Sequence, residues 1–108
     1  MGVRLKIDEH VITAYIEGDI DHHTAREIRE NIDAVILGTC PTLLYLDFGA
    51  VSFMDSSGVG LILGRYKIMQ SIKGQVRVIN APPIIGRMLK LAGISRLNIL
   101  EEKYEKIS

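Results

Sequence analysis

The alternation of strand and helix patterns along the chain limits its fold more than any other feature. Two short β-type runs open the chain, and each later helical pattern is followed by another β-type run. Such alternation implies crossover connections and a largely parallel sheet, here with an antiparallel first strand. The expected strands are residues 5–8, 11–17, 43–48, 76–79 and 97–100, and the expected helices begin at Asp21, Gly58 and Pro82.

The sequence therefore predicts a single α/β domain over residues 1–108 with the element order ββαβαβαβ(α). We expect a mixed, mostly parallel sheet of four to five strands, with three to four helices. The bracketed helix is one that the mixed-charge tail, residues 101–108, allows. The nearly continuous apolar character of residues 43–48 predicts a strand that is buried on both faces.

Turn and capping residues mark the ends of the expected elements. Gly18 should end the second strand, and Thr24 and Glu27 have the spacing of a capping box for the first helix. Gly38 is the stop signal of that helix, and Gly93 is expected to end the third helix in a left-handed conformation. The apolar residues that recur at helical spacing and should face the core are Ile28, Ile32, Val35 and Ile36, then Val59, Ile62, Leu63, Tyr66 and Met69, and finally Ile85, Met88, Leu89 and Ala92.

Composition argues against several classes of function. Lys plus Arg and Asp plus Glu both count 13, so no overall field attracts nucleic acid or an anionic membrane. No basic-then-apolar leader opens the chain and no apolar run reaches about 20 residues, which predicts neither a secreted nor a membrane-spanning protein. The single Cys40 rules out an internal disulfide and fits a reducing compartment. We therefore expect a cytoplasmic protein that binds neither nucleic acid nor membrane.

Three glycines after a strand, Gly58, Gly60 and Gly64, are similar to a dinucleotide-binding fingerprint. That fingerprint needs a tight turn from strand to helix, whereas the expected connection from Phe48 to Gly58 is long. Glycines inside a helix cost roughly 1 kcal/mol each relative to alanine. A close approach of the helix backbone to the sheet or to a partner explains these glycines better than a nucleotide does.

The sequence gives little support for a metal-binding site or for a serine hydrolase site. Asp21, His22 and His23 are adjacent, and no further ligand at metal-binding spacing accompanies them. Ser56 can be combined with a histidine and an aspartate on paper, but nothing resembles a nucleophile elbow or an oxyanion loop. We expect no enzyme activity, no cofactor and no metal site.

Two adjacent serines are expected at the start of the second helix, in the motif Asp55-Ser56-Ser57-Gly58. The first N–H groups of a helix lack intrahelical partners and the helix dipole favours negative charge there, so a phosphate on either hydroxyl would be stabilised. An unmodified serine at the same place is an ordinary N-cap. A doubled serine exceeds what capping requires, and no Glu or Gln three residues later completes a capping box. These residues alone do not decide between Ser56 and Ser57 as a modification site.

Residues 53–60, followed by Leu63-Gly64-Arg65-Tyr66-Lys67, closely resemble the anti-sigma factor antagonists of the STAS domain family. Residues 18–25, with the block Asp21-His22-His23-Thr24, resemble the loop before the first helix in the sporulation members of that family. The similarity runs over nearly the whole chain, as far as Ala92-Gly93.

The resemblance implies a small switch protein without catalytic activity. It would bind an anti-sigma factor that is also a serine kinase with bound ATP or ADP, and would thereby free the sigma factor. The kinase would phosphorylate Ser56, the first serine of the motif, and a metal-dependent serine phosphatase would restore it. A second interpretation is a STAS-type scaffold or nucleotide-sensing module of a stress-signalling assembly, although such scaffolds usually carry an additional sensory domain. The residues implied in partner binding are Asp21, Met54, Asp55, Ser57, Gly58 and Gly60.

Overall fold

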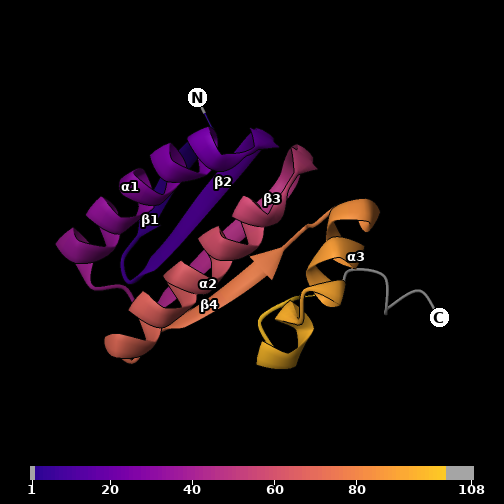
Figure 1. Cartoon of the computed structure of the whole chain (residues 1–108). Helices are drawn as coiled ribbons and strands as arrows, with labels where there is room; N and C mark the ends of the chain where they lie inside the picture. The colour runs from indigo at the N-terminus through magenta and orange to yellow at the C-terminus, as the bar shows by residue number, and fades with distance from the viewer. Residues whose placement is uncertain (1, 102–108) are drawn as a thin grey trace.

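Four strands form one sheet in the order β1-β2-β3-β4 in the computed structural model, which describes residues 2–101. The strand β1 runs antiparallel to β2, whereas β2, β3 and β4 are parallel, so the predicted mixed and mostly parallel sheet is confirmed (Figure 1). The strands are β1 (Val3–Asp8), β2 (Val11–Ile20), β3 (Leu43–Met54) and β4 (Gln75–Ile79). The helices are α1 (His22–Thr39), α2 (Ser56–Ser71) and α3 (Pro83–Leu91), followed by a short 3-10 helix over Ile94–Leu97.

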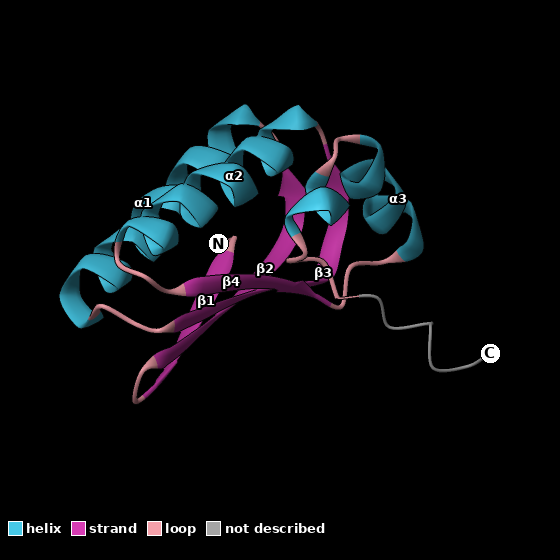
Figure 2. Cartoon of the chain, turned by 90° about the horizontal axis from the view of Figure 1, so that it is seen from below, coloured by secondary structure: helices cyan, strands magenta, loops and turns pink. Residues whose placement is uncertain are grey.

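Helices α1 and α2 cover the same face of the sheet (Figure 2). A β-α-β crossover is right-handed in nearly all proteins, and β2, β3 and β4 follow one another across the sheet, so both connecting helices lie on one side. The prediction that residues 43–48 are buried on both faces is therefore wrong. Leu44, Leu46 and Phe48 are buried beneath the helices, whereas Leu43 and Tyr45 are half-buried on the other face.

The core fills the space between the sheet and the helices. Ile28, Ile32 and Ile36 of α1 are buried as their helical spacing predicts. They pack in one cluster with side chains of the central strands, among them Ile12, Ile16, Leu44, Leu46 and Phe48.

Strands β2 and β3 are both longer than predicted. β2 continues through Gly18, which has a positive φ of 83°, to Ile20. β3 continues past Phe48 to Met54, so the expected long connection before α2 is strand instead. The added segments pair with each other, and the register of this pairing shifts at two places. Such irregularities break the alternation of side chains from which the strand ends were predicted.

The start and end of α1 differ from the prediction by a few residues. Its capping box joins Asp21 and Thr24, not Thr24 and Glu27: the Asp21 N–H donates to Thr24 Oγ1, and the Thr24 N–H donates to Asp21 Oδ1, both at 2.9 Å. The helix passes Gly38 and ends at Thr39. Its C-cap, Cys40, is exposed, carries a free thiol and has a left-handed φ of 47°.

Several predictions for the second half of the chain need correction. In α2, Leu63 is exposed, and Leu61 and Arg65 are buried with Ile62 and Met69. In α3, Ala92 is exposed rather than inward-facing.

The expected strand over residues 97–100 is reduced to one parallel bridge between Leu100 and Val78, because the 3-10 helix occupies Ile94–Leu97. Gly93 does take the predicted left-handed conformation after α3, with φ 89°. The fourth helix that the tail allowed falls on residues 102–108, outside the described residues.

Candidate functional site

The parallel strands β2 and β3 end side by side, and each leads directly into a helix. Ile20 pairs with Met54 at the ends of the two strands, and the Asp55 N–H donates to the Ile20 carbonyl oxygen at 3.1 Å. This pairing brings Asp21 and Asp55, which follow those residues, to one edge of the sheet. Both aspartates are N-caps, Asp21 of α1 and Asp55 of α2. The carboxyl edge of parallel strands is where α/β proteins most often place their sites.

Asp55 provides the cap of α2 that the sequence assigned to a serine. Its Oδ1 accepts a hydrogen bond from the Ser57 N–H at 2.8 Å. Ser56 is the first helical residue and is exposed, whereas Ser57 is half-buried. Within residues 2–101, neither serine hydroxyl makes a hydrogen bond. Both hydroxyls are therefore free of a structural role, and Ser56 is the more accessible of the two.

The exposed Asp21 carboxylate adds negative charge beside Asp55. The hydrogen bond from the Thr24 backbone N–H lowers the pKa of Asp21, and a smaller lowering comes from the nearby His23. The side chain is therefore ionised at neutral pH. The carboxylates of Asp21 and Asp55 thus lie at the same edge of the sheet, each between the end of a strand and the start of a helix.

Met54 and Gly58 pack against each other beneath the surface, where β3 turns into α2. Met54 is buried, and Gly58 lies so close to it that a Cβ at position 58 would overlap the Met54 side chain. These two predicted partner-binding residues consequently hold the backbone of the motif in place and do not present side chains to solvent. Phe53, immediately before Met54, is 56% exposed and offers apolar surface at the same edge.

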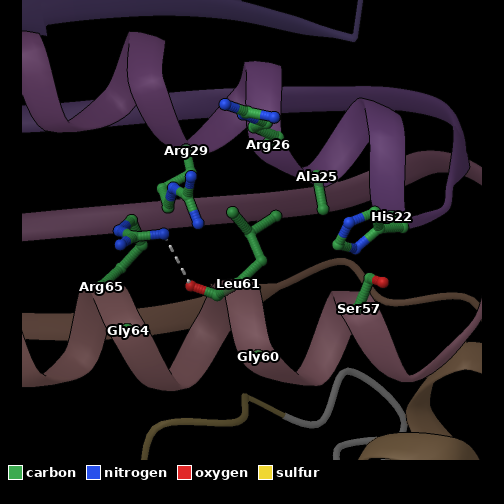
Figure 3. Close-up of a pocket in the computed structure, with 9 residues that line it drawn as sticks. All are labelled: His22, Ala25, Arg26, Arg29, Ser57, Gly60, Leu61, Gly64 and Arg65. Atoms are coloured by element: carbon green, nitrogen blue, oxygen red, sulfur yellow. Dashed lines mark hydrogen bonds between the residues drawn. The ribbon is translucent and has the colours of Figure 1, made fainter.

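A groove lies between α1 and α2, beginning next to the serines (Figure 3). It has a volume of about 440 Å³. We call it the α1–α2 groove; its lining residues are His22, Ala25, Arg26 and Arg29 of α1 and Ser57, Gly60, Leu61, Gly64 and Arg65 of α2. Among residues 2–101, a Cβ at Gly60 or at Gly64 would meet no atom within 4 Å beyond its chain neighbours and its own helix backbone, so the two glycines do not approach the sheet. Ser56 is not among the lining residues.

The basic lining of this groove, including the buried Arg65, was not predicted from the sequence. Arg65 is only 4% exposed, and its Nε lies 2.8 Å from Asp33 Oδ1 of α1 in an ion pair. Its Nη2 also donates to Asp33 Oδ2 and its Nη1 to the Leu61 carbonyl oxygen, both at 3.3 Å. Burial lowers the pKa of Arg65 despite the neighbouring Asp33. Arg65 lies four residues after Leu61 and four before Met69, both of them buried, and this spacing is the sequence signal that could have indicated its burial.

Neither a metal cluster nor a membrane span is present in the part of the chain that the structure describes. No group of three or more His, Cys, Asp or Glu side chains among residues 2–101 is arranged to hold a metal ion. Over the same residues, every helix is too short or too polar to cross a bilayer.

Comparison with known proteins gives consistent matches over almost the whole chain. The family model of the STAS domain matches residues 3–107. The anti-sigma F factor antagonist of Paenibacillus polymyxa is 31% identical over 99 residues, which cover 90% of this chain and 85% of that protein. The anti-sigma factor antagonist SpoIIAA in its unphosphorylated form superposes with a TM-score of 0.83 at 28% identity, covering 96% of this chain and 90% of that one. The Bacillus cell fate determinant SpoIIAA in its phosphorylated form gives a TM-score of 0.75 at 28% identity, covering 96% of this chain and 93% of that one.

Proposed function

The chain belongs to the STAS domain family, and from this premise we propose that it is an anti-sigma factor antagonist. In its unphosphorylated form it binds an anti-sigma factor that is also a serine kinase, and so sets the sigma factor free. The kinase, which carries the ATP or ADP, inactivates it by phosphorylating Ser56, and a serine phosphatase restores it. The protein acts in the cytoplasm as a binding module and not as an enzyme.

The observation that carries this proposal is the position of Ser56. It is exposed, it is the first residue of α2, and its hydroxyl has no hydrogen-bond partner in the described part of the chain. Because Asp55 already caps the helix, the hydroxyl can be modified without loss of a structural contact. The greater burial of Ser57 favours Ser56 as the acceptor, in agreement with its place as the first serine of the motif.

The charges around Ser56 explain how a phosphate would act. A phosphate adds about −1.5 to −2 charge. The N-terminus of α2 accommodates that charge, so the fold need not change. A docked partner, however, would meet the phosphate together with the carboxylates of Asp55 and Asp21. Acidic groups or nucleotide phosphates of the partner would be repelled, and the added charge would have to lose its water. The expected result is a large change in affinity with a nearly constant fold.

The predicted partner-binding residues divide into two groups under this proposal. Asp21, Asp55, Ser57 and Gly60 form surface that a partner can contact. Met54 and Gly58 act indirectly, by fixing the backbone that presents Ser56. This chain matches the fold of SpoIIAA in both its unphosphorylated and its phosphorylated form, which supports a switch in which the fold is retained.

Phosphate mapping tests the proposal directly. The protein and its Ser56→Ala and Ser57→Ala variants are incubated with ATP and the cognate anti-sigma factor, and modified peptides are identified by mass spectrometry. We expect phosphate on Ser56 in the wild type and in Ser57→Ala, and none in Ser56→Ala. The Ser56→Ala variant should still bind the anti-sigma factor, because the unphosphorylated state is the binding state. Phosphate on Ser57, or the absence of both modification and binding, would contradict the proposal.

A further inference from the structure

We propose that the α1–α2 groove binds an acidic segment of the partner protein, whose carboxylates meet Arg26 and Arg29 while its backbone lies against Gly60 and Gly64. This inference rests on the proposed function, because it assigns a second contact surface to the same complex. It differs from the motif around Ser56 in position and in charge.

The groove is lined by basic side chains, and only part of their charge is paired. Among its nine lining residues are three arginines and His22, and none is acidic. Arg65 is paired with Asp33, and Arg26 lies 3.7 Å from Glu30 in an exposed pair that contributes little.

Arg29 forms no ion pair with any residue in the range 2–101. It lies near enough to Arg65 for its charge to disfavour the charged form of that side chain. Because the whole chain has no formal net charge at pH 7, this is a local feature of the groove. An anionic group in the groove would relieve the repulsion between the two guanidinium groups.

The two glycines leave room on the α2 side of the groove. Gly60 and Gly64 are one turn apart, and a methyl group at either position would meet no atom of residues 2–101 within 4 Å, apart from its chain neighbours and the backbone of its own helix (Figure 3). Glycine inside a helix is unfavourable relative to alanine, and the packing of this domain does not require it at these positions. Bare backbone here allows a partner segment to lie closer to α2 than any other residue would permit.

The shape of the groove favours a peptide segment over a single small anion. From Ser57 to Arg65 its α2 wall rises about 12 Å, at 1.5 Å per residue. Ala25 and Leu61 give it apolar surface between the charged groups. A segment with two or more Asp or Glu residues would satisfy the arginines and cover this apolar surface together.

The groove also connects with the phosphorylation site. Ser57 and His22 line its end nearest to the start of α2, and Ser56 directly precedes Ser57. A phosphate on Ser56 would therefore add negative charge at that end. It would weaken the attraction of the groove for carboxylates in the complex that phosphorylation is proposed to break.

Titration of the unphosphorylated protein with its cognate anti-sigma factor tests the groove. The test variants are Arg26→Gln combined with Arg29→Gln, and separately Gly64→Leu, which fills the groove. Arg87→Gln, at an exposed arginine of α3, is the matched control. We expect the double variant to bind at least about tenfold more weakly and with a shallower salt dependence, and the control to bind like the wild type. Gly64→Leu should also bind at least about tenfold more weakly, because its side chain would occupy the space of the segment. Equal thermal midpoints of the variants would show that folding is intact.

Failure of the groove and failure of the proposed function give different results. If the wild type binds the anti-sigma factor and the double variant binds equally well, the groove inference is overturned and the function stands. If the wild type does not bind, the function fails, and the groove is tested with a hexaglutamate peptide by amide NMR. Shifts confined to Gly60, Gly64 and their neighbours, and absent in the double variant, would still support it. The absence of such shifts would overturn the groove inference. It would also be overturned if ATP, added as a competing anion, bound tightly in the groove and hexaglutamate could not displace it.

Discussion

Asp55 takes the capping role in α2, and this leaves the neighbouring serine hydroxyls unused by the fold. The separation of tasks is local: one carboxylate caps the helix, and the next residue carries the hydroxyl that we propose is phosphorylated. A residue that both capped the helix and accepted phosphate would change stability whenever it was modified. Here the two properties can be changed independently.

Replacement of Ser56 by aspartate separates binding from folding. We expect Ser56→Asp to lower affinity for the anti-sigma factor, because it adds a charge beside Asp55 and Asp21. Stability should stay within about 1 kcal/mol of the wild type, since a carboxylate in the first turn of a helix is favourable. In contrast, Asp55→Ala removes the cap and should cost about 0.5–2 kcal/mol. Urea unfolding and titration of both variants measure the two effects. A large loss of stability in Ser56→Asp would show that the side chain is needed by the fold.

The buried ion pair between Arg65 and Asp33 should respond unequally to loss of either partner. The Arg65 side chain is 5% exposed and that of Asp33 is 28% exposed. Arg65→Met leaves a carboxylate that water can still reach, so we expect a cost of about 1–3 kcal/mol. Asp33→Ala leaves a buried guanidinium without its counter-charge and should cost more, about 3–5 kcal/mol. Urea unfolding of the two variants decides the order, and the reverse order would mean that Arg65 reaches solvent when unpaired.

Asp21 should make stability depend on pH in the acid range. Its hydrogen bonds hold its pKa in the folded protein below the ordinary value of 3.8. A group of this kind stabilises the fold fully above its unfolded pKa, and the contribution is lost as pH falls through the folded pKa. We therefore expect Asp21→Asn, which keeps a capping side chain without the charge, to flatten the loss of stability below about pH 4. Urea midpoints at pH 6 and pH 3 provide the measurement, with the Asp21 pKa taken from NMR titration. Parallel curves for the two proteins would contradict the expectation.

At the scale of one helix, three glycines of α2 should respond differently to the same substitution. Gly58→Ala would press against Met54 and destabilise by roughly 1–3 kcal/mol. Gly60→Ala and Gly64→Ala meet open space and should each stabilise by up to about 1 kcal/mol, because alanine is the better helix former. We further expect Gly60→Ala to bind the anti-sigma factor less well. Calorimetry together with titration tests both points: unchanged affinity would remove Gly60 from the docking surface.

Element types could be predicted from side-chain patterns, whereas several element ends could not. The spacing of Ile28, Ile32 and Ile36 correctly identified the buried side of α1. The run to Met54 in β3 was missed because shifts in pairing interrupt the alternation of exposed and buried side chains. The cap of α2 was displaced by one residue, from serine to Asp55, because aspartate and serine are almost equally good N-caps.

At the scale of the whole molecule, the order of the strands determines which face of the sheet the helices cover, and the sequence patterns do not. The apolar run 43–48 was expected to be covered on both faces, as in sheets whose helices lie on both sides. Because each new parallel strand is added in the same direction, one face of the sheet stays without helices among residues 2–101. The groove was not predicted, because it depends on how two helices pack against each other. In the sequence, Arg26 and Arg29 are ordinary exposed charges of α1, and only the packing of α2 brings Arg65 into the same groove.

Hydrogen exchange should show a ranking of stability across the domain. Strands β2 and β3 are each paired on both sides and lie beneath α1 and α2, whereas β1 is an edge strand. We expect the slowest exchange at the amides of β2 and β3, and faster exchange in β1 and in the 3-10 helix. Ser56→Asp should leave this ranking unchanged if the switch acts at the surface. Exchange measured by mass spectrometry on both proteins would detect a change, and faster exchange in β3 of the variant would contradict a rigid switch.

The position and exposure of Cys40 have a practical consequence for measuring these interactions. This residue ends α1 at the opposite end from Asp21, and an 18-residue helix is about 27 Å long. Its thiol is exposed, and it is the single cysteine of the chain. A fluorophore or a tether to a sensor surface can therefore be attached there by thiol chemistry without a designed mutation. Such a label would stand one helix length away from the serines while it reports each binding event.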